Sequence, residues 1–171
     1  MSVNNRNIDP TIRDEFVKIL LGLYSDEWLA VYQYSIESDF CLMLLTKNRI
    51  SEKVYNEINK ELQIHTEEEF NHSKLLVPEL IRMGSGPISH IDNLSNYANT
   101  KLLVPYTNEI ITLEQSIKSE QDAINGYTKA LGFLNQYFRN DIKLIDKFKF
   151  ILDQEYEHKT DLEKILLELN K

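Results

Sequence analysis

The 171-residue chain contains little cysteine, glycine and proline, and its negative charges outnumber its positive ones. Its single cysteine, Cys41, excludes an intrachain disulfide and leads us to expect a reducing, cytoplasmic setting. The 5 glycines and 4 prolines, and the lack of long polar and apolar alternation, argue against a β-sheet. A net charge of −8 without a Lys and Arg cluster predicts no DNA or membrane binding, and no apolar run predicts a signal or a membrane span.

The pattern that remains is typical of long helices. Apolar residues at helical spacing predict helices from Pro10 to Leu45, from Ser51 to Gly84, from Thr107 to Phe138 and, after a turn at Arg139 to Asp141, over the rest of the chain to Asn170. Residues 1–9 are polar and are expected to form a mobile arm, and residues 85–106 are expected to be irregular. The length suits one domain over residues 1–171.

The lengths of the connections predict how these helices are arranged. Short turns near residues 48 and 140 make the first two helices an antiparallel pair, and the last two another pair. A helix of about 30 residues is about 45 Å long, and the segment between the pairs can extend to about 70 Å. We therefore predict an all-α four-helix bundle in which a long crossover makes the second and third helices parallel.

Two copies of the pattern glutamate, aromatic, any residue, histidine mark the candidate site. They are Glu69 to His72 on the second helix and Glu155 to His158 on the fourth. Residues three apart on a helix lie on the same face, so that each pair can bind one metal ion. The first and third helices share a second pattern, Glu-x-x-Ala-[Val/Ile]-x-x-Tyr, which begins at Glu27 and at Glu120. The two helix pairs therefore resemble two copies of one unit.

The positions of these residues along the chain predict that they meet. Glu27 and Glu69 are each 21 residues from residue 48, so an antiparallel hairpin places them at one level. Glu120 and Glu155 are nearly equidistant from the second turn. Four buried carboxylates without counter-charge would be very unfavourable, whereas two divalent cations would compensate them. Carboxylate and imidazole ligands favour iron or manganese.

This ligand pattern resembles that of the ferritin-like di-iron carboxylate superfamily, with bacterioferritins and Dps-like ferritins (DNA protection during starvation) most similar. The resemblance covers nearly the whole chain. It implies that Glu27 and His72 bind one iron, that Glu120 and His158 bind the other, and that Glu69 and Glu155 bridge them. It also implies an electron-donating role for Tyr34, and for Tyr127 a hydrogen bond to a ligand.

Departures from related families narrow the expectation. Ala123 stands where rubrerythrins carry another glutamate, and there is no Cys-x-x-Cys. Phe70 stands where bacterioferritins have a haem-binding Met, so we expect no haem. The 13 residues after His158 are too few for the fifth helix of 24-subunit ferritins, which favours a homo-oligomeric shell of 12 subunits.

The resemblance implies a ferroxidase that oxidises Fe(II) with hydrogen peroxide or dioxygen, for iron storage and protection from oxidative stress. Manganese or zinc remains open as the metal. One alternative is another di-metal enzyme on the same fold, such as a manganese catalase or a rubrerythrin-like peroxidase. A second is a non-enzymatic helical shell with a structural metal site. His65, one turn before Glu69, is expected to be a surface residue, with a role in iron passage as the alternative.

Overall fold

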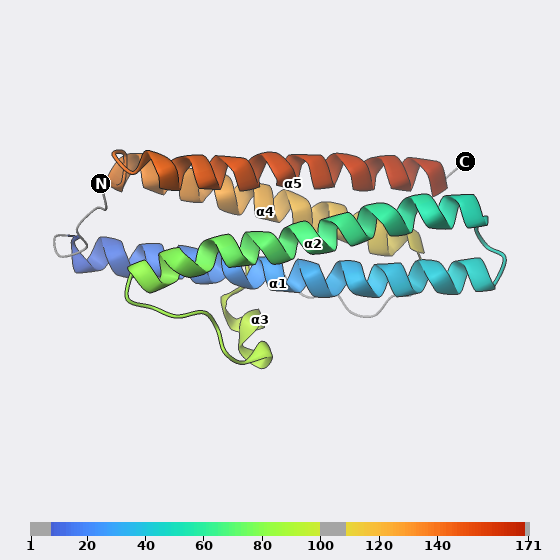
Figure 1. The fold of residues 1–171 in the computed structure, drawn as a ribbon, viewed down its shortest axis with the longest axis horizontal. Helices are drawn as coiled ribbons and strands as arrows, with labels where there is room; N and C mark the ends of the chain where they lie inside the picture. Colours follow the sequence, from blue (N-terminus) through green and yellow to red (C-terminus); the bar gives the residue numbers. More distant parts are fainter. Residues whose placement is uncertain (1–7, 100–108, 170–171) are drawn as a thin grey trace.

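Four long helices form the body of the molecule in the computed structural model, which describes residues 8–99 and 109–169 (Figure 1). In chain order the elements are α1 (Pro10–Thr46), α2 (Glu52–Arg82), η2 (Ile91–Asn93), α3 (Leu94–Tyr97), α4 (Glu109–Tyr137) and α5 (Ile142–Leu169). The described residues contain no strand, as predicted. The predicted third-helix start at Thr107, the last predicted residue Asn170 and positions 1–7 of the arm lie outside the described residues.

The starts of α1 and α2 follow the capping signals in the sequence. The Asp9 carboxylate accepts hydrogen bonds from the amides of Thr11 and Ile12, and the Ser51 hydroxyl accepts one from the Val54 amide. Asp9 therefore belongs to the helix cap, and the part of the expected mobile arm that is described is ordered. At the end of α2, Gly84 adopts a φ of +81°, a conformation that glycine adopts without strain.

The helix directions agree with the predicted topology. α1 and α2 run antiparallel, as do α4 and α5, and α2 and α4 run in the same direction (Figure 1). The described part of the connection between α2 and α4, up to residue 99, is more ordered than predicted, because it contains η2 and α3. Gly22 lets this segment lie close on α1, since a Cβ there would come within 2.9 Å of the Asn99 amide nitrogen. Asn99 in turn donates a hydrogen bond to Asp26.

Two separate clusters of buried apolar side chains lie on either side of the bundle's middle. The cluster near the start of α1 and the end of α4 includes four stacked or tilted rings, those of Phe16, Phe133, Phe138 and Phe148. We call this region the aromatic end. The other cluster contains Cys41, Ile58, Leu62, Leu113 and Ile165. The buried polar residue Glu37 lies in that region, which we call the Glu37 end.

Candidate metal centre

The six predicted ligand residues meet between the two apolar clusters. Each comes from the middle of a long helix, where the hydrogen-bonded backbone fixes its position, and each is at most 3% exposed to solvent. The equal distances of Glu27 and Glu69 from their turn therefore did predict their level in the bundle. The six residues are Glu27, Glu69, His72, Glu120, Glu155 and His158.

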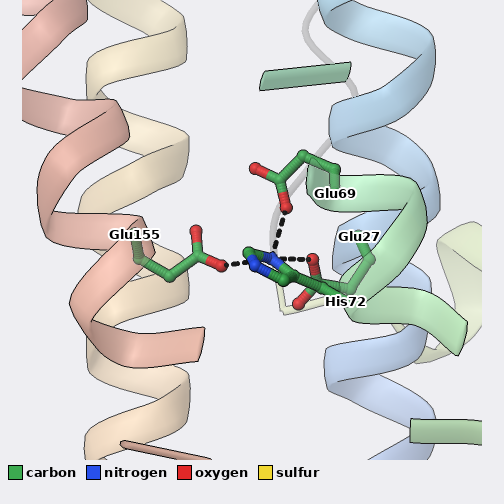
Figure 2. Close-up of side chains that lie close together, drawn as sticks. All are labelled: Glu27, Glu69, His72 and Glu155. Atoms are coloured by element: carbon green, nitrogen blue, oxygen red, sulfur yellow. Dashed lines mark hydrogen bonds and ion pairs between the residues drawn. The ribbon is translucent and has the colours of Figure 1, made fainter. Parts of the chain in front are cut away.

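His72 lies at the centre of three carboxylates (Figure 2). Its Nδ1 is 3.2 Å from Glu27 Oε2, 3.1 Å from Glu69 Oε2 and 3.1 Å from Glu155 Oε1. The three carboxylates come from α1, α2 and α5. A single N–H group has one proton to donate, so this arrangement has more acceptors than protons.

The second histidine has a similar but looser environment. Nδ1 of His158 is 3.1 Å from Glu69 Oε1, 3.9 Å from Glu120 Oε2 and 4.0 Å from Glu155 Oε2. Glu120 Oε2 is buried and has no hydrogen-bond partner among the described residues. A buried carboxylate oxygen without a partner is costly and is typical of a site that binds a further group.

These residues form two overlapping groups whose donor atoms lie within 4.8 Å of one another. One group contains Glu27, Glu69, His72 and Glu155, and the other contains Glu69, Glu120, Glu155 and His158. Glu69 and Glu155 belong to both groups. The geometry therefore suits two adjacent cations with two shared carboxylates.

Two tyrosines connect the halves of the centre. The Tyr34 hydroxyl of α1 donates a hydrogen bond to Glu120 of α4, and the Tyr127 hydroxyl of α4 donates one to Glu27 of α1. Both tyrosines are fully buried. Burial and the nearby Glu27 raise the pKa of Tyr127 well above its usual value, which keeps its hydroxyl protonated as a donor. The two hydroxyls thus fix one carboxylate each.

The charges of the centre strongly perturb the carboxylate pKa values. Burial together with repulsion from Glu69 and Glu155 raises the pKa of Glu27 well above its usual value. Burial and Glu155 do the same for Glu120. Burial also acts to raise the pKa of Glu69, but the neighbouring His158 and His72 hold it well below the usual value. Glu27 and Glu120 therefore bind a proton more readily than an exposed glutamate does, and Glu69 binds one less readily.

The pKa values of both histidines are shifted upwards. Burial acts to lower the pKa of His158, but Glu69, Glu120 and Glu155 raise it to about 10. Burial likewise opposes a charge on His72, and Glu27, Glu155 and Glu69 raise its pKa far more. Both imidazoles therefore carry a proton that a metal ion would have to displace.

Two residues that support the histidines were not predicted. His72 Nε2 lies 3.0 Å from Gln154 Oε1, and His158 Nε2 lies 2.9 Å from Glu68 Oε2. Gln154 also donates a 2.7 Å hydrogen bond to Glu68. Such partners orient metal-binding imidazoles. The only signal for them in the sequence is that a long polar residue directly precedes both Glu69 and Glu155.

A small cavity of about 20 Å³ opens beside the centre, between α1 and α4. It is large enough for a water-sized molecule. Its lining combines carboxylates of the centre with polar and small residues: Asp26, Glu27, Leu29, Ala30, Gln33, Glu69, Ser119, Glu120, Ala123 and Glu155. A small reactant could therefore reach the carboxylates from this face.

The expectation for His65 as a surface residue is wrong. The side chain is only 2% exposed, because it packs between the rings of Tyr34 and His158, with centroids 5.4 and 4.3 Å away. Burial and His158 lower the pKa of His65 to about 4. The helical position of His65, one turn from Glu69, places it towards the bundle interior, which the surface interpretation overlooked.

No helix in the described ranges is both long enough and apolar enough to cross a lipid bilayer.

Comparisons with known proteins identify the type of fold. Neither a protein-family model nor a curated protein matches the chain. Among solved structures, one similar chain is the bacterioferritin-related protein of Bacteroides fragilis, described as a dodecameric thioferritin. It is 26% identical over 95% of this chain and 89% of its own, with a TM-score of 0.77. Another is Dps from Thermosynechococcus elongatus, 11% identical over 91% and 92%, with a TM-score of 0.78. The chain therefore has the ferritin-like fold of the bacterioferritin-related and Dps proteins.

Proposed function

We propose that the protein is a ferroxidase of the ferritin and Dps-like type, which oxidises Fe(II) at a two-metal centre within each subunit. The observation that carries this proposal is the crowding of three carboxylate oxygens within 3.2 Å of one nitrogen, His72 Nδ1. One proton cannot satisfy three carboxylates, but a metal ion that displaced it could bind several of them.

The charge balance supports two divalent ions. Four carboxylates and two imidazoles are buried together, and two dications would neutralise the carboxylates in full. Glu27 and His72 would bind one ion, Glu120 and His158 would bind the other, and the shared Glu69 and Glu155 would bridge them. The donor set contains no thiolate, which suits iron better than a thiolate-preferring metal, with manganese as the next candidate and zinc as the redox-inactive one.

The chemistry that these ions supply is the transfer of one electron each, so that one peroxide is reduced to two hydroxides, or one dioxygen with two protons to peroxide. The protein's residues would hold the ions in place. Tyr127 would fix Glu27, Glu68 and Gln154 would orient the imidazoles, and the cavity between α1 and α4 would admit the small oxidant. Tyr34, which donates to Glu120, would be the residue that supplies a further electron.

The wider role that we propose is iron storage and protection from oxidative stress in the cytoplasm. The fold is shared with a protein described as a dodecameric thioferritin, which supports a shell of 12 copies of this chain. The net charge of −8 supports a function without DNA binding.

The test is rapid mixing of the metal-free protein with two Fe(II) per chain and then with hydrogen peroxide or dioxygen, while ferric absorbance is followed. Glu69→Gln removes a shared carboxylate and keeps the side-chain size. Glu67→Gln removes the charge of an exposed residue two positions away and serves as the matched control. We expect E69Q to slow oxidation at least about 100-fold, and E67Q to oxidise at the wild-type rate. Helical circular dichroism checks that both variants fold.

Equal rates in E69Q and the wild type would contradict the assignment. Rapid release of oxygen from peroxide by the manganese-loaded protein would favour a manganese catalase instead, and bound zinc without redox turnover would favour the structural site. Light scattering of the same samples measures the number of subunits. A dimer would contradict the proposed shell.

A further inference from the structure

A third group of candidate ligands lies outside the two-metal centre, on its opposite face. Glu61 and His65 are one turn apart on α2, and Asp161 faces them from α5. One donor atom from each residue lies within 4.8 Å of the other two. The cavity described above lies between α1 and α4, so this group occupies the other open side of the bundle.

The buried histidine sets this group apart from an ordinary acidic patch. The His65 side chain is 2% exposed, and its Nδ1 has no hydrogen-bond partner in the described part of the chain. Its Nε2 is 4.0 Å from Asp161 Oδ2, which is beyond hydrogen-bond distance. A buried imidazole nitrogen without a partner costs free energy unless another group binds it.

We infer that Glu61, His65 and Asp161 form a separate site for a third divalent transition-metal ion. An imidazole with two carboxylates is a donor set that such ions prefer, and three protein ligands leave positions open for water. The Glu61 and Asp161 side chains are about one-third exposed, at 34% and 32%. An ion can therefore enter from solvent, while the imidazole holds a fixed position.

Movements of the two carboxylates complete the site. Donor atoms bound tetrahedrally at about 2.1 Å from a metal lie about 3.4 Å apart. The donors of this group lie within 4.8 Å of one another, so they have to close by up to about 1.4 Å. The partly exposed carboxylates have room for this shift. At present Lys164 Nζ contacts Asp161 Oδ1 at 2.7 Å, and Lys60 Nζ is 3.8 Å from Glu61 Oε1. These exposed lysines partly balance the charge of the carboxylates and compete with a metal ion.

The third site is independent of the function proposed above, and equilibrium binding of Co(II) to the full-length protein tests it. The site variant combines Glu61→Gln with Asp161→Asn. The control combines Glu57→Gln and Glu163→Gln, which removes the same charge from exposed positions on the same helices. We expect calorimetry to give three tight ions per chain for the wild type and the control, and two for the site variant.

A second variant is expected to strengthen Co(II) binding at the third site instead of abolishing it. Lys164→Gln removes the competing cation, so we expect Co(II) to bind the third site several-fold more tightly. Anomalous diffraction from Co(II)-loaded crystals should show a peak between Glu61, His65 and Asp161 in the wild type and none in E61Q/D161N.

The outcomes separate this inference from the two-metal proposal. Two ions in both the wild type and E61Q/D161N would overturn the third site and leave the two-metal centre intact. One ion in the wild type that is lost in E61Q/D161N would support the third site and overturn the two-metal centre. Equal loss in E61Q/D161N and in the E57Q/E163Q control would mean diffuse acidic binding and would also overturn the third site.

Discussion

The two ends of the bundle are built from related sequences but differ in chemistry. The repeat that pairs Glu27 with Glu120 and Glu69 with Glu155 also pairs His65 with Ile151. It further pairs Glu37 with Ala130 and Ser116 with Leu23. At the Glu37 end the first member of each pair is a buried polar residue, and at the aromatic end its counterpart is apolar and buried.

The two ends of the bundle therefore differ in what their buried residues do: those at the aromatic end form an apolar core, and those at the Glu37 end include polar groups. The aromatic end packs rings and leucines around Phe16, where burial is purely favourable. At the Glu37 end, the Ser116 hydroxyl donates to a buried carboxylate, Glu37, whose Oε2 has no hydrogen-bond partner among the described residues. Buried polar groups of this kind cost stability. We therefore expect the aromatic end to contribute most of the stability.

The largest effect that tests this comparison comes from Leu20 and its counterpart Leu113. Both are buried, Leu20 at the aromatic end and Leu113 at the Glu37 end. The cost of a leucine-to-alanine change depends on how well the surroundings relax into the cavity. We expect Leu20→Ala to lower the free energy of unfolding by about 4 kcal/mol and Leu113→Ala by about 2 kcal/mol. Urea denaturation measures both, and equal losses would argue against a stability difference between the ends.

The next effect concerns pH and Glu37. Burial raises the pKa of Glu37 to about 8, from an ordinary value of 4.5. The folded state therefore holds a proton that the unfolded state releases above pH 4.5, so that stability falls as the pH rises from 4.5 to about 8. We expect Glu37→Gln, which needs no proton, to be more stable than the wild type by about 2 to 4 kcal/mol at pH 9.

Urea denaturation of the wild type and E37Q at pH 4.5 and pH 9 provides the measurement. At pH 4.5 the two proteins should differ little, because Glu37 is then protonated in the folded state. A constant difference between the two proteins at both pH values would show that Glu37 does not hold a proton in the folded state.

A smaller effect separates the two tyrosines of the centre. Tyr34→Phe and Tyr127→Phe each delete one hydroxyl that donates to a buried glutamate, so each is the other's matched control. If Tyr34 supplies an electron, Y34F should slow Fe(II) oxidation about tenfold, a cost of about 1.4 kcal/mol. Y127F should slow it less than about threefold. Rapid mixing gives the rates, and equal slowing would assign both hydroxyls a positioning role only.

The smallest expected effect is the loss of one helix cap at each end of the bundle, which tests whether the two ends differ in their helix starts and not in their cores. Asp9 caps α1 at the aromatic end, and Ser51 caps α2 at the Glu37 end. Asp9→Ala and Ser51→Ala should each lower the unfolding free energy by about 1 kcal/mol. Similar values in urea denaturation would place the difference between the ends in their cores. A much larger loss at one end would place it in the helix starts.

Much of the fold could be predicted from the sequence, because its signals are local. Ser51 and Gly84 mark helix ends through their own backbone chemistry, and the equal spacing of Glu27 and Glu69 from their turn sets their level. The α3 helix was not predicted, because it is only four residues long and packs on α1 through the close approach at Gly22.

The site was less predictable beyond its six central residues. The hydrogen bonds of Glu68 and Gln154 cross between α2 and α5, and no pattern within one helix states which partner a polar side chain meets. The burial of His65 likewise depends on the ring of Tyr34 from another helix. Contacts between helices that are distant in the sequence therefore determine the surroundings of Glu68, Gln154 and His65. The sequence repeat alone does not distinguish these buried or paired residues from surface residues.

The most direct test of the two-metal centre is anomalous diffraction at the iron edge from crystals loaded anaerobically with Fe(II). Our account predicts two adjacent iron peaks, one beside Glu27 and His72 and the other beside Glu120 and His158, with Glu69 and Glu155 between them. A single peak, or iron bound only at the protein surface, would contradict it.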